Sequence, residues 1–370
     1  MDFKSLREKA RSLYSSGQVD QAIAVQQTLI NQQTDTNGSV LVADYRQLAF
    51  FLIAAKRADD AVNVLRPVVE VRDNDADLSS ILGLCHTNLR QFDLAIPYLR
   101  RALELDSDCF LAADQLTRCY LGRGERTKAK LAGENSLAIK DRLFASAPAF
   151  PVDKAVTPFD PAKSRGNVIA FSLWGDNPRY LSGAVRNCEL AAELYPLWQC
   201  RFYVDDTVPN TVVKNLGARG ADVRKMAARK YLYEGLFWRF YVISDPNIDR
   251  YLIRDCDAVI NVKERVAVEQ WLQSDKHFHL MRDYYTHTDL VMAGLWGGVG
   301  GVITEIETMV ADFLQSHIQS RVMDQVFLNE CLWSTIRQSC LVHDSCFDAY
   351  QAQRFPRYCS LPPGRHIGQD

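Results

Sequence analysis

The sequence predicts an α plus α/β protein, in which an array of helical repeats precedes an α/β domain. A 34-residue periodicity of small and apolar residues runs through the first third of the chain. A proline-rich stretch follows it, and short apolar runs then alternate with helical patterns. We therefore predict helical repeats over residues 1–145, a linker over 146–166 and an α/β domain over 167–370.

The composition is that of an ordinary globular protein. Of the 370 residues 47% are hydrophobic, and the net charge of −2 predicts no broad surface for nucleic acid. The chain has no apolar run long enough for a transmembrane helix. No export signal is visible, so we predict a cytoplasmic protein, with peripheral membrane association as the alternative. None of the ten cysteines forms a CxxC pair, which favours reduced thiols over a zinc site or a disulfide framework.

Small residues recur at one place in successive repeats. Ala61, Ala95 and Ala129 follow one another at the 34-residue period, and Ala22 marks a weaker first copy. A small residue at a fixed place lets the two helices of a pair approach closely, and stacked pairs then bury a continuous core. We expect these alanines to be packing residues.

This period resembles that of tetratricopeptide (TPR) repeats, over about residues 2–141. The aromatic residue expected early in each repeat is mostly absent, so the resemblance depends on the period. It implies a TPR-like solenoid of helix pairs whose groove offers a binding surface to a protein or peptide partner.

The second domain has short apolar runs typical of strands. We predict strands over 168–173, 199–204, 221–225, 250–254 and 278–283, and helical segments over 179–194 and 231–244. A turn beginning at Trp174 follows the first strand, and an acidic pair follows the fourth. Open α/β sheets bind their ligands at the carboxyl ends of the strands, so these two segments are the first candidates for a site.

The acidic pair consists of Asp255 and Asp257, directly after the apolar strand 250–254. Two hard oxygen ligands suit Mg²⁺ or Mn²⁺, and such an ion can in turn hold a diphosphate. A solvated turn is the alternative interpretation, and pairs such as Asp106 and Asp108 at a repeat junction fit it. Asp255 and Asp257 differ because they end an apolar strand inside an α/β pattern.

Several segments of residues 167–370 together resemble glycosyltransferases of the GT-A type, a Rossmann-like α/β fold. The matching segments are 172–175, 254–257, 294–298, 324–328 and 365–368. The resemblance implies Mn²⁺ or Mg²⁺ bound by Asp255, Asp257 and His366, with His343 as the competing histidine. It also implies a nucleoside-diphosphate sugar as donor and a glycan or protein hydroxyl as acceptor.

Physical arguments extend the donor site, and each has an alternative. Trp174 either stacks on a nucleotide base or caps the core, and Trp296 either faces a sugar ring or lies in the core. Arg239 offers a planar donor fork to a phosphate, or forms an ion pair with the acidic pair. Gly294 and Gly297 let the backbone approach a sugar closely. The predicted donor-binding set is Trp174, Arg239, Arg254, Asp255, Gly294, Trp296 and Gly297.

Asp324 and Asp289 are the candidate catalytic carboxylates. Asp324 opens a predicted helix and resembles the family position that contacts the acceptor or stabilises the reacting centre; a helix N-terminal carboxylate is the alternative. Asp289 and His287 lie in a polar loop and are candidates for a base or a hydroxyl anchor. An inverting enzyme needs such a base, whereas a retaining one does not.

The predicted function is metal-dependent transfer of a sugar, with the repeats recruiting the acceptor or a partner. Two alternatives belong to other classes. One is a non-catalytic repeat scaffold with an inactive transferase domain, and the other is a metal-dependent nucleotide-sugar hydrolase. The intact set of Asp255, Asp257 and His366 favours an enzyme over a scaffold.

Overall fold

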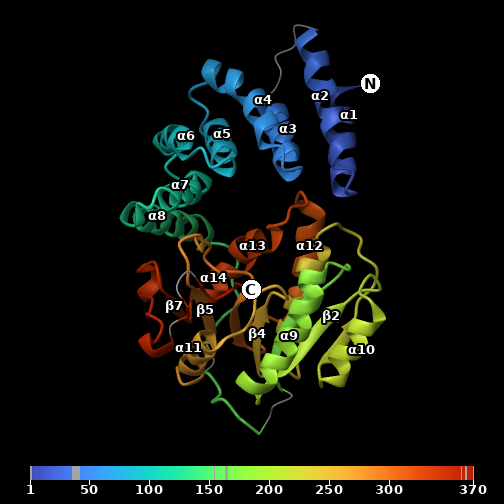
Figure 1. Ribbon diagram of the computed structural model, residues 1–370, viewed down its shortest axis with the longest axis vertical. Coiled ribbons are helices and arrows are strands. Elements are labelled where there is room, and N and C mark those ends of the chain that lie inside the picture. Colours follow the sequence, from blue (N-terminus) through green and yellow to red (C-terminus); the bar gives the residue numbers. More distant parts are fainter. Residues whose placement is uncertain are drawn as a thin grey trace. The chain divides into compact units, whose positions relative to one another are not determined.

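The structure is a computed structural model that describes residues 2–35, 42–153, 155–162, 166–359, 361–362 and 365–369. The chain divides into two compact units, Met1–Leu143 and Phe144–Asp370 (Figure 1). The described residues of the predicted linker belong to the second unit. There the Ser334 hydroxyl donates to the Pro148 carbonyl oxygen at 2.8 Å, and the Phe150 N–H donates to Thr335 Oγ1 at 3.0 Å.

The first unit is built of helices that follow one another in pairs. They are α1 Phe3–Ser15, α2 Val19–Asp35, α3 Val42–Ala54, α4 Ala58–Val71, α5 Ala76–Asn88, α6 Phe92–Leu105, α7 Phe110–Gly122 and α8 Arg126–Phe144, blue to green in Figure 1. The repeat alanines Ala22, Ala61, Ala95 and Ala129 are all 0% exposed. At Gly83 of α5 an added Cβ would lie 2.4 Å from Leu99 of α6, so these two helices are closely packed. The helical repeat array is therefore confirmed.

The second unit holds a seven-stranded mixed sheet in the order β3-β2-β1-β4-β6-β5-β7. The strands are β1 Asn167–Leu173, β2 Gln199–Val204, β3 Asp222–Lys225, β4 Arg250–Arg254, β5 Phe278–Arg282, β6 Leu295–Val299 and β7 Cys340–Asp344. Neighbours among β1 to β4 are parallel, as are β5 and β7, while β6 runs antiparallel to β4 and β5. Strand order reverses at β1, because β2 pairs with one of its edges and β4 with the other. Ligands of open α/β sheets bind at such reversals.

The helices of this unit connect successive strands. They are α9 Pro178–Leu194, α10 Asn210–Ala218, α11 Val262–Leu272, α12 Ile306–Ser316, α13 Met323–Phe327 and α14 Trp333–Ile336, with a π-helical turn over Leu328–Leu332. Apolar side chains of α9 and α11 share one core with β1, β2 and β4. Helix α9 begins at once after the β1 turn because Asn177 caps it and Pro178 occupies its first position.

The segment predicted as a helix over 231–244 is different in the structure. It forms two 3₁₀ helices, Glu234–Leu236 and Trp238–Ser244. The second buries five of its seven side chains, Trp238, Arg239, Phe240, Val242 and Ile243. Burial on nearly every side, rather than an amphipathic period, determines the shape of this segment.

No helix in the described part of the chain is long and apolar enough to cross a membrane.

A pair of buried histidines joins β5 to β7. His279 Nε2 lies 2.8 Å from His343 Nδ1, and His343 Nε2 lies 2.7 Å from Gln270 Oε1. Both histidines are 0% exposed. Burial lowers the pKa of His343 to about 4 and holds that of His279 well below its usual range. The structure therefore places His343, the competing metal ligand, in the core.

The buried pair predicts acid sensitivity. Because the pKa of His343 is depressed in the folded state, its contribution to stability is present above pH 6.5 and is lost as the pH falls toward 4. Between pH 7 and 4.5 this loss is about 2 kcal/mol of unfolding free energy. We expect the unfolding free energy of His343→Gln to fall correspondingly less between pH 7 and pH 4.5. Urea unfolding at the two pH values measures this. An equal fall in both proteins would contradict this account.

Candidate functional site

The candidate site lies where β1 and β4 end side by side. Phe171 of β1 is the sheet partner of Arg254 of β4, so the turn at Trp174 and the acidic pair leave the same edge. The Cys256 thiol between the two aspartates donates to the Ser172 carbonyl oxygen at 3.2 Å. The sequence-predicted turn and acidic pair are thus brought together at the reversal of strand order.

Arg239 connects two acidic side chains at this edge. Its Nη1 donates to Asp255 Oδ1, and its Nη2 donates to Asp324 Oδ2 at 2.8 Å. Its backbone N–H donates to Ser172 Oγ at 2.9 Å, which ties Arg239 to β1. Arg239 and Asp324 are buried, whereas the side chain of Asp255 is 41% exposed. Asp255 is therefore the member of this trio that a ligand can reach.

Asp324 serves Arg239 in this arrangement. Burial raises the pKa of Asp324 to about 6, although the Arg239 charge acts in the opposite direction. Oδ2 accepts from Arg239, and Oδ1 accepts from the Gln325 N–H at 3.0 Å. Both oxygens are thus occupied inside the protein, which favours a role in holding Arg239 over contact with an acceptor.

Asp257 is the second carboxylate of the acidic pair. Burial raises its pKa, and the neighbouring charge of Asp255 raises it further. Arg179 Nη2, at 3.4 Å from Asp257 Oδ2, offsets part of this effect. Two neighbouring carboxylates form a place where a cation is stabilised.

Two residues of α9 hold the acidic loop, and the sequence reasoning missed both. The Asn187 side chain is fully buried and donates to the carbonyl oxygens of Cys256 at 3.2 Å and Ala258 at 3.0 Å. It also accepts from the Ile260 N–H at 2.9 Å. A Cβ at Gly183 would lie 2.1 Å from the Cys256 carbonyl oxygen. The available signal was a Gly and an Asn four residues apart on the buried face of an amphipathic helix.

Gly294 lies against Asp255. An added Cβ there would be 1.9 Å from Asp255 Oδ2, so glycine is needed for the carboxylate to keep its position. Gly297 has a different reason, because its Cβ would lie 2.5 Å from the Tyr251 carbonyl oxygen within the β4–β6 pairing. The structure thus associates Gly294 with the site, and Gly297 with the packing of the sheet instead of the predicted sugar contact.

Arg254 and Trp296, both predicted to bind the donor, lie in the core. Arg254 is 1% exposed; its Nε donates to Glu264 Oε1 at 3.1 Å, and its Nη1 donates to the Trp296 carbonyl oxygen at 3.0 Å. Trp296 is 0% exposed and meets Phe240 and Tyr251 edge to face. Successive side chains of a strand point to opposite faces, so Arg254 faces away from the side chain that follows it.

Trp174 stays accessible beside the site. It is half-buried and lies over Gly235, where an added Cβ would be 2.7 Å from its ring. The Arg229 guanidinium lies 5.9 Å from the ring centroid, and Arg229 Nε donates to Asp205 Oδ2 at 3.1 Å. The ring is therefore fixed at the ends of β1 and β2, with part of its surface open to a ligand.

His366 does not join the acidic pair. Its ring stacks on Tyr284 with centroids 4.5 Å apart and meets His287 edge to face at 5.0 Å. The adjacent Ile367 N–H donates to Asp283 Oδ2 at 2.8 Å, which anchors this segment beyond β5. Over the ranges that the structure describes, no three His, Cys, Asp or Glu side chains are grouped so as to hold a metal ion.

The loop after β5 carries Asp289 and His287, and His287 contacts His366. His287 is buried; its Nδ1 accepts from the Asp283 N–H at 3.1 Å, and burial lowers its pKa to about 3. Asp289 is half-buried, and its carbonyl oxygen accepts from Arg282 Nη1 at 3.4 Å. Of the two, Asp289 is the more accessible candidate for contact with a hydroxyl.

The residues present fit a Mg²⁺ or Mn²⁺ ion through two carboxylates. Mg²⁺ commonly binds through one or two carboxylates together with water and the phosphates of a substrate. Oδ1 of Asp255 is engaged by Arg239, and Oδ2 of Asp257 lies 3.4 Å from Arg179 Nη2, so Asp255 Oδ2 and Asp257 Oδ1 are the oxygens that would bind the ion.

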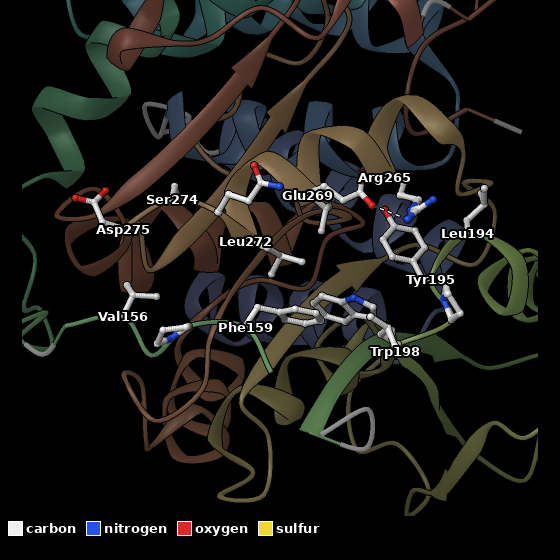
Figure 2. A pocket seen from close by; sticks show the side chains of 15 residues that line it. Val156, Phe159, Leu194, Tyr195, Trp198, Arg265, Glu269, Leu272, Ser274 and Asp275 are labelled. Carbon is white, nitrogen blue, oxygen red and sulfur yellow. Dashed lines mark hydrogen bonds and ion pairs between the residues drawn. The ribbon is translucent and has the colours of Figure 1, made fainter. Parts of the chain in front are cut away.

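A separate apolar pocket of about 790 Å³ lies elsewhere in the second unit (Figure 2). Phe159, Trp198 and Leu272 line it, and the Arg265–Glu269 ion pair, with N···O of 2.5 Å, lies at one side. Its residues precede β2 and β5, so it is at the amino ends of the strands. None of the predicted site residues lines it.

No protein-family model matches the chain, and no curated protein matches it. Among solved structures, a MamA protein (MSR-1) is 20% identical, with a TM-score of 0.33 over 39% of this chain and 79% of that one. A thermophilic TPR protein of Thermus thermophilus is 16% identical, with a TM-score of 0.34 over 38% and 75%. An O-GlcNAc transferase mutant of Thermobaculum terrenum is 18% identical, with a TM-score of 0.43 over 68% and 45%. At these TM-scores the likenesses identify no function for this chain.

The contact between Gly294 and Asp255 makes a testable prediction. Gly294→Ala should push the Asp255 carboxylate off Arg239 and lower the free energy of unfolding by about 1–3 kcal/mol. Gly217→Ala is the matched control, because nothing lies within 4 Å of an added Cβ there, and it should be neutral or stabilising by up to ~1 kcal/mol. Urea unfolding measures both.

A double variant separates this contact from general strain. In Asp255→Ala the clashing oxygen is absent, so adding Gly294→Ala should cost much less than it does in the parent protein. Equal costs in the two backgrounds would show that Gly294 acts on something other than Asp255.

Proposed function

We propose that the second unit is a metal-dependent glycosyltransferase of the GT-A type. It would transfer a sugar from a nucleoside-diphosphate sugar to a hydroxyl of a glycan or protein acceptor. The observation that carries the proposal is the acidic pair of Asp255 and Asp257 at the reversal of strand order, with Asp255 bonded to the buried Arg239. The half-buried Trp174 beside it supports a place for a nucleotide base.

The protein's own residues would divide the work. Asp255 and Asp257 would hold Mn²⁺ or Mg²⁺, and that ion would stabilise the charge that develops on the departing diphosphate. Arg239 orients Asp255, and Asp324 keeps Arg239 in place. Asp289 is the proposed contact for the acceptor hydroxyl, because both Asp324 oxygens are engaged within the protein.

The buried charges favour an enzyme over a scaffold. Removing charged groups from water costs several kcal/mol each, and Arg239 and Asp324 are both buried next to the half-exposed Asp255. A protein that only binds partners through its repeats has no need of such a cluster at the edge of its second unit. A nucleotide-sugar hydrolase would use the same ion, but would release the sugar to water at full rate without an acceptor.

Substitution of the acidic pair tests the proposal. Asp255→Asn and Asp257→Asn should each abolish the Mn²⁺-dependent thermal shift with the nucleotide that the parent protein prefers, and lower transfer at least 100-fold. Asp312→Asn, at an exposed position of α12, is the control and should behave like the parent protein. The screen uses UDP, GDP and CMP sugars with and without Mn²⁺. Unchanged binding in either variant, or in excess chelator, would refute the metal site.

We further propose that the first unit recruits the acceptor or a protein partner. Repeat solenoids present extended surfaces for binding. This unit also exposes apolar side chains that its own core does not use: Val71 is 84% exposed, Leu131 61% and Leu94 53%. Because the second unit is compact by itself, the two activities can be separated.

Removal of residues 1–143 should affect acceptor and donor differently. We expect kcat/KM for a macromolecular acceptor to fall at least tenfold, while hydrolysis of the donor stays within twofold of the full chain. Parallel assays of transfer and donor hydrolysis measure this. An equal loss of both would mean that the repeats serve only the stability of the second unit.

A further inference from the structure

A second, basic pocket of about 770 Å³ adjoins the acidic pair. Its polar lining consists of Arg179, Ser182 and Arg186 of α9, Asp257 after β4, and Arg365 and Gln369 near the C-terminus. We call it the arginine pocket, after Arg179, Arg186 and Arg365. The proposed transfer reaction assigns no role to these three side chains.

The helix that carries two arginines of the pocket also contacts the loop that carries Asp257. Arg179 and Arg186 are seven residues apart on α9 and so lie on one face of the helix. Between them, Gly183 packs directly on the Cys256 carbonyl oxygen. One residue beyond Arg186, the buried Asn187 makes three hydrogen bonds to the acidic loop. The two arginines therefore project from a helix whose position relative to Asp257 is fixed.

The charge of the pocket suits a dianion. Three guanidinium groups and one carboxylate line it, which leaves a formal charge of +2 (3 − 1). Arg179 already contacts Asp257 at 3.4 Å, while its side chain remains 56% exposed. Guanidinium groups bind phosphate through paired N–H donors, and a phosphate monoester carries close to two negative charges at neutral pH.

The C-terminal wall of the pocket and Trp174 lie on opposite sides of the acidic pair along the sheet edge. The neighbours of Trp174 lead toward β2, because Arg229 over its ring is bonded to Asp205 after β2. The C-terminal wall of the pocket lies toward β5 and β6. Ile367 is bonded to Asp283 after β5, and an added Cβ at Gly368 would lie 3.2 Å from a Leu295 methyl at the start of β6.

This order along the edge indicates what would reach Arg365 and, across the pocket, the two arginines of α9. A donor with its base at Trp174 and its diphosphate at the acidic pair would already have its phosphates placed. What extends beyond the acidic pair is the transferred sugar and the acceptor.

We propose that the arginine pocket binds a phosphate monoester carried by the acceptor, so that the enzyme modifies a phosphorylated acceptor. The acceptor assignment rests on the proposed transferase function, whereas the anion site rests on the pocket alone. Arg186 is its most informative residue, because it lines the pocket at an exposed position of α9 without contacting the acidic pair.

Inorganic phosphate is the first probe, titrated calorimetrically into the full chain with chelator present to exclude metal. We expect saturable binding that weakens at least tenfold in Arg186→Gln. Arg224→Gln is the control, since this arginine lies on β3 and pairs with Asp222 outside the pocket. Equal affinity of phosphate for the parent protein and Arg186→Gln would overturn the site.

The second arm repeats the titration with Mn²⁺ and the preferred nucleoside diphosphate at saturation. Unchanged phosphate affinity supports a separate site, whereas displacement would assign the arginines to the diphosphate of the donor and overturn the proposal. If phosphate binds but no nucleotide does, the anion site stands and the transferase and acceptor assignments both fail.

The third arm compares a sugar phosphate with the same unphosphorylated sugar as acceptor. We expect kcat/KM to favour the phosphorylated acceptor at least tenfold in the parent protein and in Arg224→Gln, and this preference to shrink in Arg186→Gln. The acceptor assignment would be overturned if the parent protein showed no preference for the phosphorylated acceptor. It would also be overturned if the parent protein instead preferred a donor that carries an acidic sugar.

Discussion

The site depends on the ion pairs of Arg239. This buried guanidinium bonds to Asp324 on one side and to the half-exposed Asp255 on the other. A charge removed from water is stable only when it is paired and hydrogen-bonded, so each member of the trio constrains the other two. The arrangement leaves one oxygen of Asp255 directed to the space that Gly294 keeps open. The geometry of the proposed cation site thus follows from a core interaction.

Helix α9 gives the second constraint. Its inner face, through Gly183 and Asn187, holds the loop that carries Asp257, while its outer face carries Arg179 and Arg186. One helix therefore positions both a proposed metal ligand and the proposed anion site. Its start is fixed by the cap at Asn177, directly after β1, so the helix, the turn at the end of β1 and the acidic loop form one framework.

Local patterns predicted most of the elements but not which side chains face the site. The strands at 199–204 and 250–254 were predictable because apolar runs end at turn residues. The resemblance implies donor contact for Arg254, and the ring of Trp296 offers a face to a sugar, but both faces of the sheet are covered at β4 and β6, so both side chains lie in the core. His366 was assigned by resemblance, but the bond from Ile367 to Asp283 holds its segment beyond β5.

The sequence by itself determined the division into a repeat array and an α/β unit, and it selected Asp255 and Asp257. Both follow from local periodicity and from the position of polar residues after apolar runs. Only the tertiary structure decided that Arg239 joins Asp324 to Asp255, that Asn187 holds the acidic loop, and that the distant Arg365 lines one pocket with Arg179 and Arg186 of α9. These contacts depend on strand order and helix packing, which bring together residues as distant as 179 and 365, and no local pattern encodes that distance.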